Sequence, residues 1–174
     1  MRSRMLVAGA LLALAATGAR AQDAGKNVLT LQPLSAVFGF YSAEYERVGS
    51  KTVTWGLGGN YWHIGDSGDE VKYTSGEFKL RYYPSGEAPK GFSLGGAIGV
   101  TSVSGRTNDG DEGSVAGPSL GVLLEYQWLL GEKQNFSVVL GAGAKAINTK
   151  DADFSNGDYT AKYPTARISV GWRF

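Results

Sequence analysis

The 174-residue chain has no cysteine, one histidine and no apolar run long enough to cross a bilayer as a helix. Without cysteine, neither a disulfide nor a thiol nucleophile is available, so the chain must bury apolar surface in a core or in lipid. A transmembrane helix needs about 20 apolar residues, and the run at 5–16 is shorter than that. Beyond this run, amphipathic helical spacing is missing, which argues against a helical fold.

The first 25 residues, MRSRMLVAGALLALAATGARAQDAG, have the pattern of a secretory signal peptide. Two arginines precede the apolar run, and Ala-Arg-Ala at 19–21 matches a cleavage pattern. We therefore expect residues 1–21 to be cleaved as a signal peptide and residues 22–174 to form a single domain. Because no cysteine follows the apolar run, we do not expect a lipid-anchored lipoprotein.

Composition excludes one class of partner. Cleavage would remove Arg2, Arg4 and Arg20, leaving 14 of the 17 Lys and Arg against all 16 Asp and Glu, a net charge of −2. This balance gives no basis for binding nucleic acid. The chain is instead rich in glycine, with 26 residues, and contains 13 Tyr and Trp.

Alternation of apolar and polar residues recurs along the chain and predicts eight strands. They cover residues 27–36, 39–48, 52–64, 72–84, 91–104, 115–130, 135–148 and 162–174. Most are far longer than the roughly 5–6 residues usual in globular proteins, and a tilted membrane-spanning strand needs about 9–11. Tight turns alternate with longer polar connections at 65–71, 105–114 and 149–161. The sequence therefore predicts an all-β, eight-stranded antiparallel up-and-down transmembrane β-barrel.

Charged residues fall on the non-apolar face at mid-strand positions: Glu44, Glu77, Lys79, Arg81, Glu125, Lys145 and Arg167. Facing lipid, a Lys or Arg at mid-depth would cost about 2–4 kcal/mol, so we expect this face to line the lumen. Three acids and four bases can then pair as a lumen ion-pair network. Eight strands leave an interior just wide enough for side chains, and inward glycines would make room for the long charged ones. We expect a polar, mostly plugged lumen.

The apolar face at the tight-turn end carries a set of aromatic residues that would form an interfacial girdle: Tyr45, Tyr82, Phe92, Trp128, Phe136, Trp172 and Phe174. The last strand, TARISVGWRF, alternates up to its final residue, with Val170, Trp172 and Phe174 on the apolar face. This ending resembles the C-terminal assembly signal by which bacterial outer-membrane barrels are recognised by the barrel-assembly machinery.

Together with the signal peptide, this pattern resembles the small eight-stranded barrels of the OmpA/OmpX kind. The segment LSAVFGFYSAEYERV at 34–48 also resembles an uncharacterised family of small outer-membrane barrels. The resemblance implies the outer membrane of a Gram-negative bacterium as the location. It implies outer-membrane lipids, lipopolysaccharide and the assembly machinery as partners. We expect a monomer with no cofactor.

Candidate chemistry is sparse. The single histidine, His63 in NYWHIGD, could be a catalytic base beside Asp66. The outer-membrane lipid A deacylase uses a His with a Ser two residues on, but Gly65 stands there. We therefore expect an interfacial histidine and no catalytic residue.

The acidic segment at 106–114 loosely resembles a calcium loop, but Gly113 stands where a third ligand is expected. Acidic residues in the other long connections could share a divalent cation with lipopolysaccharide; solvated charge is the simpler interpretation, and we expect no metal site.

These observations favour a non-enzymatic outer-membrane protein that supports envelope integrity or surface interactions through its long external loops. One alternative is a narrow ion or solute channel through the charged lumen. Others are a lipid-modifying outer-membrane enzyme and a soluble ligand-binding barrel.

Overall fold

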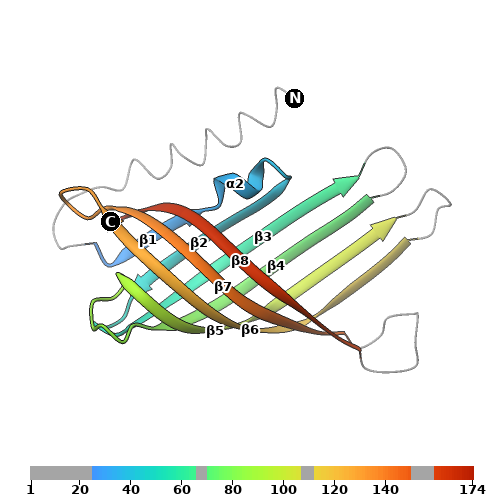
Figure 1. Ribbon diagram of the computed structural model, residues 1–174. Helices are drawn as coiled ribbons and strands as arrows, with labels where there is room; N and C mark the ends of the chain where they lie inside the picture. Colours follow the sequence, from blue (N-terminus) through green and yellow to red (C-terminus); the bar gives the residue numbers. More distant parts are fainter. Residues whose placement is uncertain (1–24, 66–69, 107–111, 150–158) are drawn as a thin grey trace.

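Eight strands form a closed antiparallel barrel, in chain order from β1 to β8, in a computed structural model that describes residues 25–65, 70–106, 112–149 and 159–174 (Figure 1). The strands are β1 Asn27–Leu31, β2 Phe40–Val48, β3 Val53–Gly65, β4 Glu70–Tyr82, β5 Gly91–Arg106, β6 Glu112–Leu130, β7 Phe136–Thr149 and β8 Tyr159–Arg173. The predicted all-β, eight-stranded, up-and-down barrel is confirmed. Tight turns and the C-terminus lie at one end, called here the turn end; the opposite end is the loop end.

The strands extend further toward the loop end than the apolar alternation predicts. β6 begins at Glu112 and β8 at Tyr159, each three residues earlier than expected, and β5 continues to Arg106. The ladder persists there because backbone pairing does not need apolar side chains: Glu70 pairs with Arg106, and Arg106 with Glu112. The centres of the predicted long connections, at 66–69, 107–111 and 150–158, lie outside the described residues.

The first predicted strand is wrong beyond Leu31. Residues Pro33–Ala36 form a short helical turn, α2, in place of the expected continuation to residue 36 (Figure 1). Proline suits the first turn of a helix because it has no N–H to leave unpaired there. Gly39, at a φ of +77°, then redirects the chain into β2. Among the described residues, no helix is long and apolar enough to cross a membrane.

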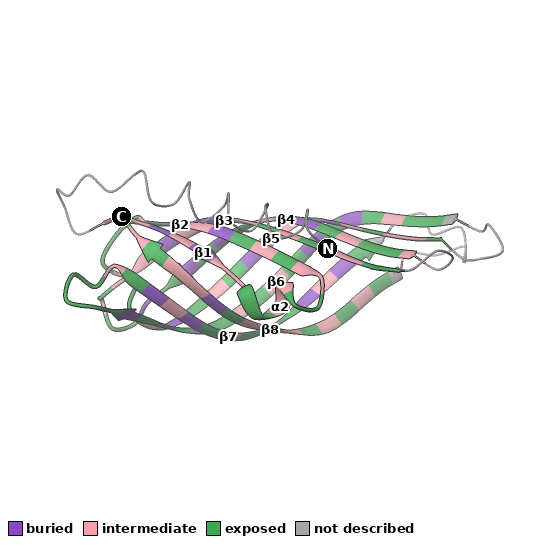
Figure 2. Cartoon of the chain, turned by 90° about the horizontal axis from the view of Figure 1, so that it is seen from above, coloured by how far each residue is buried: buried purple, intermediate pink, exposed green. Residues whose placement is uncertain are grey.

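Side chains alternate between the lumen and the outer face, visible as stripes of differing burial along each strand (Figure 2). The outer face is apolar along the middle of the strands, and its exposed residues include Leu57, Phe78, Leu80, Ile98, Leu120, Val122, Leu124, Leu140 and Ile168. The predicted girdle residues all lie on this face toward the turn end. Outward charges flank the apolar zone: Arg47 lies near the turn end, and Lys72 and Lys162 lie toward the loop end.

The chain terminus is part of the barrel wall. Asn27 N donates to Phe174 O over 2.9 Å, and Phe174 N donates back to Asn27 O over 2.8 Å. Arg173 adds a hydrogen bond from its Nε to Gly25 O, 2.6 Å away. The final residue therefore closes the ring between the first and last strands.

Candidate functional site: the charged lumen and the cavity above it

Glu44 on β2 is the centre of the lumen ion-pair network. Its Oε2 accepts hydrogen bonds from Lys79 Nζ and Arg167 Nη1, each over 2.7 Å. Its Oε1 lies 2.6 Å from Arg81 Nη2. Only 3% of the Glu44 surface is exposed, so one buried carboxylate is paired with three cations from β4 and β8.

Glu125 on β6 completes the pairing of two of these cations. Arg81 Nε donates to its Oε2, and Arg167 Nη1 lies 3.2 Å from its Oε1. Arg81 is 2% exposed, which makes it the largest fully buried side chain of the described residues. Burying a charge is tolerable only when it is paired, and both arginines meet carboxylates from two sides of the barrel.

A second polar group, nearer the loop end, links β4 to β7 and β8. Lys145 Nζ lies 2.5 Å from Glu77 Oε1 and donates to the Tyr73 hydroxyl over 3.0 Å. The hydroxyls of Tyr73 and Tyr163 are 3.2 Å apart. Lys79 lies 3.4 Å from Glu77 Oε2 and so connects this group to Glu44. All seven residues of the predicted network therefore meet inside the barrel.

The sequence interpretation missed two members of this network, Glu46 and Tyr83. Glu46 Oε1 accepts hydrogen bonds from Thr54 Oγ1 over 2.5 Å and from the Tyr83 hydroxyl over 3.0 Å, and lies 3.6 Å from Arg81 Nη1. Glu46 has the same parity along β2 as Glu44, and Tyr83 the same parity as Arg81, so the alternation could have revealed both. With Glu46 included, four acids face four bases in the lumen.

The lumen at the turn end is packed solid. Side chains there are almost completely buried, among them Val28, Thr54, Arg81, Tyr83, Ser93, Ser137 and Ser169. Glycines provide part of the space: a Cβ on Gly141 would lie 2.8 Å from Glu125 Cγ, and one on Gly56 would lie 3.4 Å from Glu44 Oε1. The charged cluster therefore fills the barrel below the level of Glu77, as the predicted plug requires.

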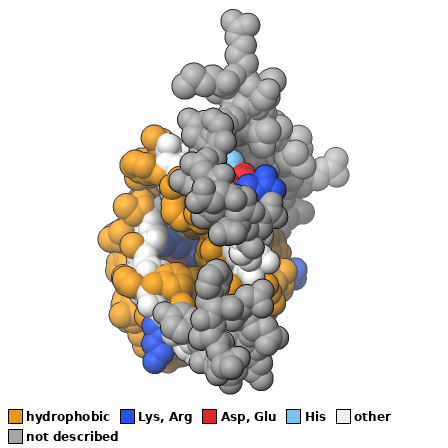
Figure 3. All heavy atoms as spheres, turned by 90° about the vertical axis from the view of Figure 1, so that its right-hand side faces the viewer, with side chains coloured by type: hydrophobic (Ala, Val, Ile, Leu, Met, Phe, Trp, Pro, Cys, Tyr) orange, Lys and Arg blue, Asp and Glu red, His pale blue; other side chains and the backbone are white. Residues whose placement is uncertain are grey.

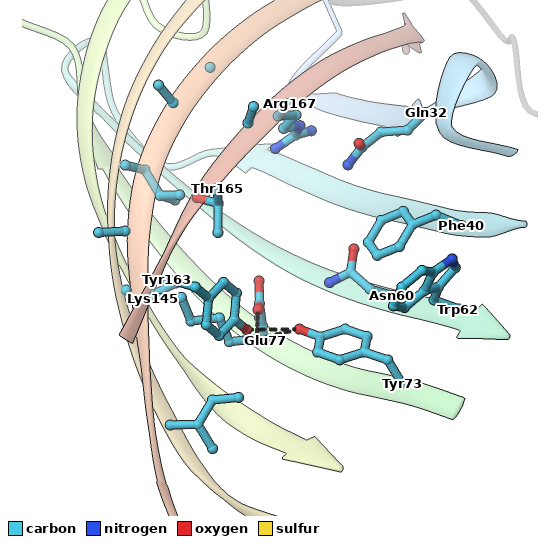
Figure 4. A pocket seen from close by; sticks show the side chains of 18 of the residues that line it. Gln32, Phe40, Asn60, Trp62, Tyr73, Glu77, Lys145, Tyr163, Thr165 and Arg167 are labelled. Carbon is cyan, nitrogen blue, oxygen red and sulfur yellow. Dashed lines mark hydrogen bonds and ion pairs between the residues drawn. The ribbon is translucent and has the colours of Figure 1, made fainter. Parts of the chain in front are cut away.

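Above the plug, the lumen holds a cavity of about 710 Å³ (Figure 4). Aromatic and aliphatic side chains form much of its wall, including Phe40, Trp62, Tyr73, Val103, Leu123, Ile147 and Tyr163. Charged residues of the plug form its floor: Glu77, Lys79, Glu125, Lys145 and Arg167. Seen along the barrel from the loop end, Lys or Arg side chains are visible inside a hollow framed by hydrophobic ones (Figure 3). An apolar chamber over a charged floor was not anticipated from the sequence.

His63 lies on the outer face of β3 near the loop end, away from this cavity. Its Nε2 is 2.5 Å from Glu70 Oε1, which also accepts the ammonium of Lys72 at 2.9 Å. Its suggested partner Asp66 lies outside the described residues. His63 therefore belongs to a polar cluster that joins β3 and β4 at the loop end.

The residues of the proposed assembly signal share the outer face of β8. Val170 is opposite Val138 and Trp172 opposite Phe136 on β7, while Trp172 is opposite Leu29 on β1. Phe174 follows on the same face. The structure thus presents all three on the outer surface of the closing strand, and their role in assembly stays a prediction.

The described residues include no cluster of three or more His, Asp or Glu arranged to hold a metal ion. Most of the acidic segment at 106–114 lies outside them. Comparisons of the chain with protein-family models, curated proteins and solved structures find no match.

Proposed function

We propose that the protein is a non-enzymatic, non-conducting β-barrel of the bacterial outer membrane that contributes to the envelope as a monomer. The proposal rests on the distribution of apolar and charged side chains over the outer face. Large apolar side chains are exposed on every strand from β2 to β8, and the outward charged side chains of the described residues lie at the two rims. In water such a surface would be an aggregation hazard, whereas in a bilayer it is what a spanning barrel requires.

The inner face supports the same proposal. Buried charges pair across the lumen, so the polar groups of the barrel point away from the apolar face. A soluble ligand-binding barrel would have the reverse arrangement, with apolar residues inside and charged ones outside. The closed strand order also satisfies the backbone along the turn-end half without an open edge, which a lipid environment demands.

The packed turn end supports a non-conducting barrel over the narrow channel. Arg81 and its three carboxylate partners occupy the centre of the lumen, and the small polar residues beneath them are fully buried. The position of His63 supports a non-enzymatic role, because its ring pairs with Glu70 on the outer rim. The proposed partners are outer-membrane lipids and lipopolysaccharide around the apolar zone of the outer face, together with the barrel-assembly machinery.

Fractionation of a Gram-negative host that expresses the chain tests the proposal. We expect the protein in the outer-membrane fraction, extracted only by detergent, and migrating differently on gels before and after boiling. An epitope inserted at 107–111 should be accessible on intact cells if the loop end faces outward. Recovery as a detergent-independent periplasmic protein would overturn the membrane assignment, and an inaccessible epitope on a correctly inserted barrel would overturn the orientation.

A further inference from the structure

The wall of the barrel has a seam in its loop-end half, between β8 and the segment that follows β1. β1 is only five residues long, and its pairing with β8 joins Val28 to Arg173 at one end and Leu31 to Val170 at the other. β8 continues from there back to Tyr159, so residues 159–169 extend past the end of β1. At about 3.3 Å per residue, this leaves about 35 Å of strand without β1 beside it. α2 lies at this position, in contact with both β2 and β8.

The cavity reaches this seam. Gln32, Phe38 and Phe40 line it on one bank, and Ala161, Tyr163 and Thr165 line it on the other. Gln32 and Phe40 lie across the cavity from Tyr163 and Thr165 in Figure 4. Phe38 contributes to the lining although 76% of its surface is exposed. Phe38 therefore borders both the cavity and the exterior at this bank of the seam.

The seam opens within the apolar zone of the outer face. Ile168 and Ala166 are outward residues of β8 along it, and Leu34, Val37 and Phe38 are exposed on the opposite bank. If the barrel spans a membrane, as proposed above, the end of the seam nearest the turn end faces acyl chains, and α2 lies against the edge of β8 there. Its apolar banks would let such a chain pass from the bilayer into the chamber without crossing water.

The floor of the chamber indicates what polar group the acyl chain would carry. The charged residues that line the cavity are two acids, Glu77 and Glu125, and three bases, Lys79, Lys145 and Arg167. Bases outnumber acids among the lining residues, and Glu44, which pairs with Lys79 and Arg167 beneath the floor, balances the cluster. Lys145 donates to Glu77 and to the Tyr73 hydroxyl, which leaves the third of its three N–H groups to donate at the edge of the apolar wall. The hydroxyls of Tyr73 and Tyr163 share one hydrogen bond, so one of the two has a proton to donate there as well. These groups suit a carboxylate, which accepts charge-assisted hydrogen bonds.

We infer that this chamber binds one single-chain anionic amphiphile, a long-chain carboxylate, which enters through the seam between β8 and α2. Its carboxylate lies near Lys145, and its chain lies among Phe40, Trp62 and Tyr163. The volume is within the roughly 300–1,000 Å³ of small-molecule sites, which suits one acyl chain. This inference rests on the proposed membrane location for the source of the ligand.

Tryptophan fluorescence tests the inference because Trp62 is the one tryptophan that lines the cavity, whereas Trp55, Trp128 and Trp172 belong to the outer face. The full barrel would be reconstituted in phosphatidylcholine nanodiscs as a variant in which Trp62 is the only tryptophan. A second variant would retain Trp128 alone. The probes are a chain-brominated fatty acid, the corresponding brominated fatty alcohol and a brominated two-chain phospholipid.

We expect the fatty acid to quench Trp62 saturably, at about one molecule per barrel, and at least tenfold more tightly than the alcohol. The brominated phospholipid should quench Trp128 and leave Trp62 unaffected. Ala161→Phe fills the chamber and should abolish the saturable quenching. Ala116→Phe adds the same ring to the outer face of β6 and should not. Lys145→Gln should remove the preference for the acid, whereas Lys162→Gln on the outer face should retain it.

Quenching of Trp62 that rises in parallel with that of Trp128, without saturation, would overturn the site. Equal binding of acid and alcohol by the unmodified lumen would overturn the carboxylate assignment, and this comparison needs no substitution in the lumen. Failure of the barrel to enter nanodiscs would overturn the proposed membrane function instead. An inserted barrel with an unquenched Trp62 would overturn only this inference.

Discussion

Glu44 on β2 and Arg167 on β8 are 123 residues apart in the chain, and their side chains meet over 2.7 Å inside the barrel. β1 lies between β2 and β8 in the strand order, so this contact connects two strands that do not pair with each other. The same carboxylate also holds Lys79 and Arg81. One acid therefore connects the two ends of the sequence to the middle of the barrel.

Replacing this acid should be costly. Glu44→Gln keeps the shape of the side chain but leaves three buried cations short of a counter-charge. Removing one partner of a buried ion pair typically costs about 3–5 kcal/mol. We expect a loss of this size in the free energy of unfolding, measured by urea titration of the barrel in lipid vesicles.

The matched control is Glu87→Gln. Glu87 is exposed in the turn after β4, and its nearest cation, Lys90, is 3.7 Å away. Exposed pairs contribute little, so this variant should unfold like the parent protein. If both variants lose equally little, the cluster does not stabilise the barrel.

The inward glycines should tolerate no side chain where they face the cluster. In Gly141→Ala, the new Cβ would lie 2.8 Å from Glu125 Cγ, and we expect a loss of about 1–3 kcal/mol from overpacking. Gly76→Ala is the control, because no atom outside its neighbours lies within 4 Å of its Cβ position. Equal urea midpoints for the two variants would show that the Glu125 side chain can move aside.

Because side chains fill the lumen at the turn end, we expect the barrel not to conduct ions. The parent barrel should give no conductance steps in planar bilayers, because paired charges and buried small residues fill its centre. The double variant Glu44→Ser with Arg81→Ser removes an acid and a base together and should introduce measurable conductance. Steps from the parent barrel that change in Glu125→Gln or Arg167→Gln would favour the narrow channel instead.

Much of the barrel could be predicted because strand alternation is a local property. Each inward or outward position of β2 to β8 follows from parity, and so does the meeting of seven charged residues in the lumen. The strand ends could not be predicted in this way. Polar residues such as Glu70 and Glu112 stay in the ladder, since pairing with a neighbouring strand depends on the backbone of both.

No pattern in the sequence indicated the seam or the chamber. They exist because β1 stops at Leu31, where Gln32-Pro33 begins the turn, while β8 continues without it. Whether β8 has β1 beside it depends on both ends of the chain, so no local pattern in either strand can indicate it. The alternation of Leu29, Leu31 and Pro33 predicted one face of a longer strand. That strand would have paired with more of β8 and closed the wall at the seam.

A charge on the apolar belt should distinguish lipid from water around the barrel. Leu124→Arg places a guanidinium near the middle of the outer face of β6 and should cost about 2–4 kcal/mol in a bilayer. Ala116→Arg, nearer the loop end of the same face, should cost only about 0–1 kcal/mol. The comparison uses urea unfolding in vesicles. For a water-soluble barrel, the two substitutions would have similar and small effects.

The terminal residue has two separable roles, one in its backbone and one in its ring. Deleting Phe174 removes both the aromatic ring and the pair of hydrogen bonds with Asn27, whereas Phe174→Ala removes the ring alone. If the ring is an assembly signal, Phe174→Ala should slow insertion in cells, followed as the appearance of heat-modifiable protein after induction. The same variant, once folded in vesicles, should unfold nearly as the parent does. Phe92→Ala removes another exposed aromatic at the turn end and is the control. Equal insertion rates for the two alanine variants would show that Phe174 acts through its backbone, by closing β1 against β8.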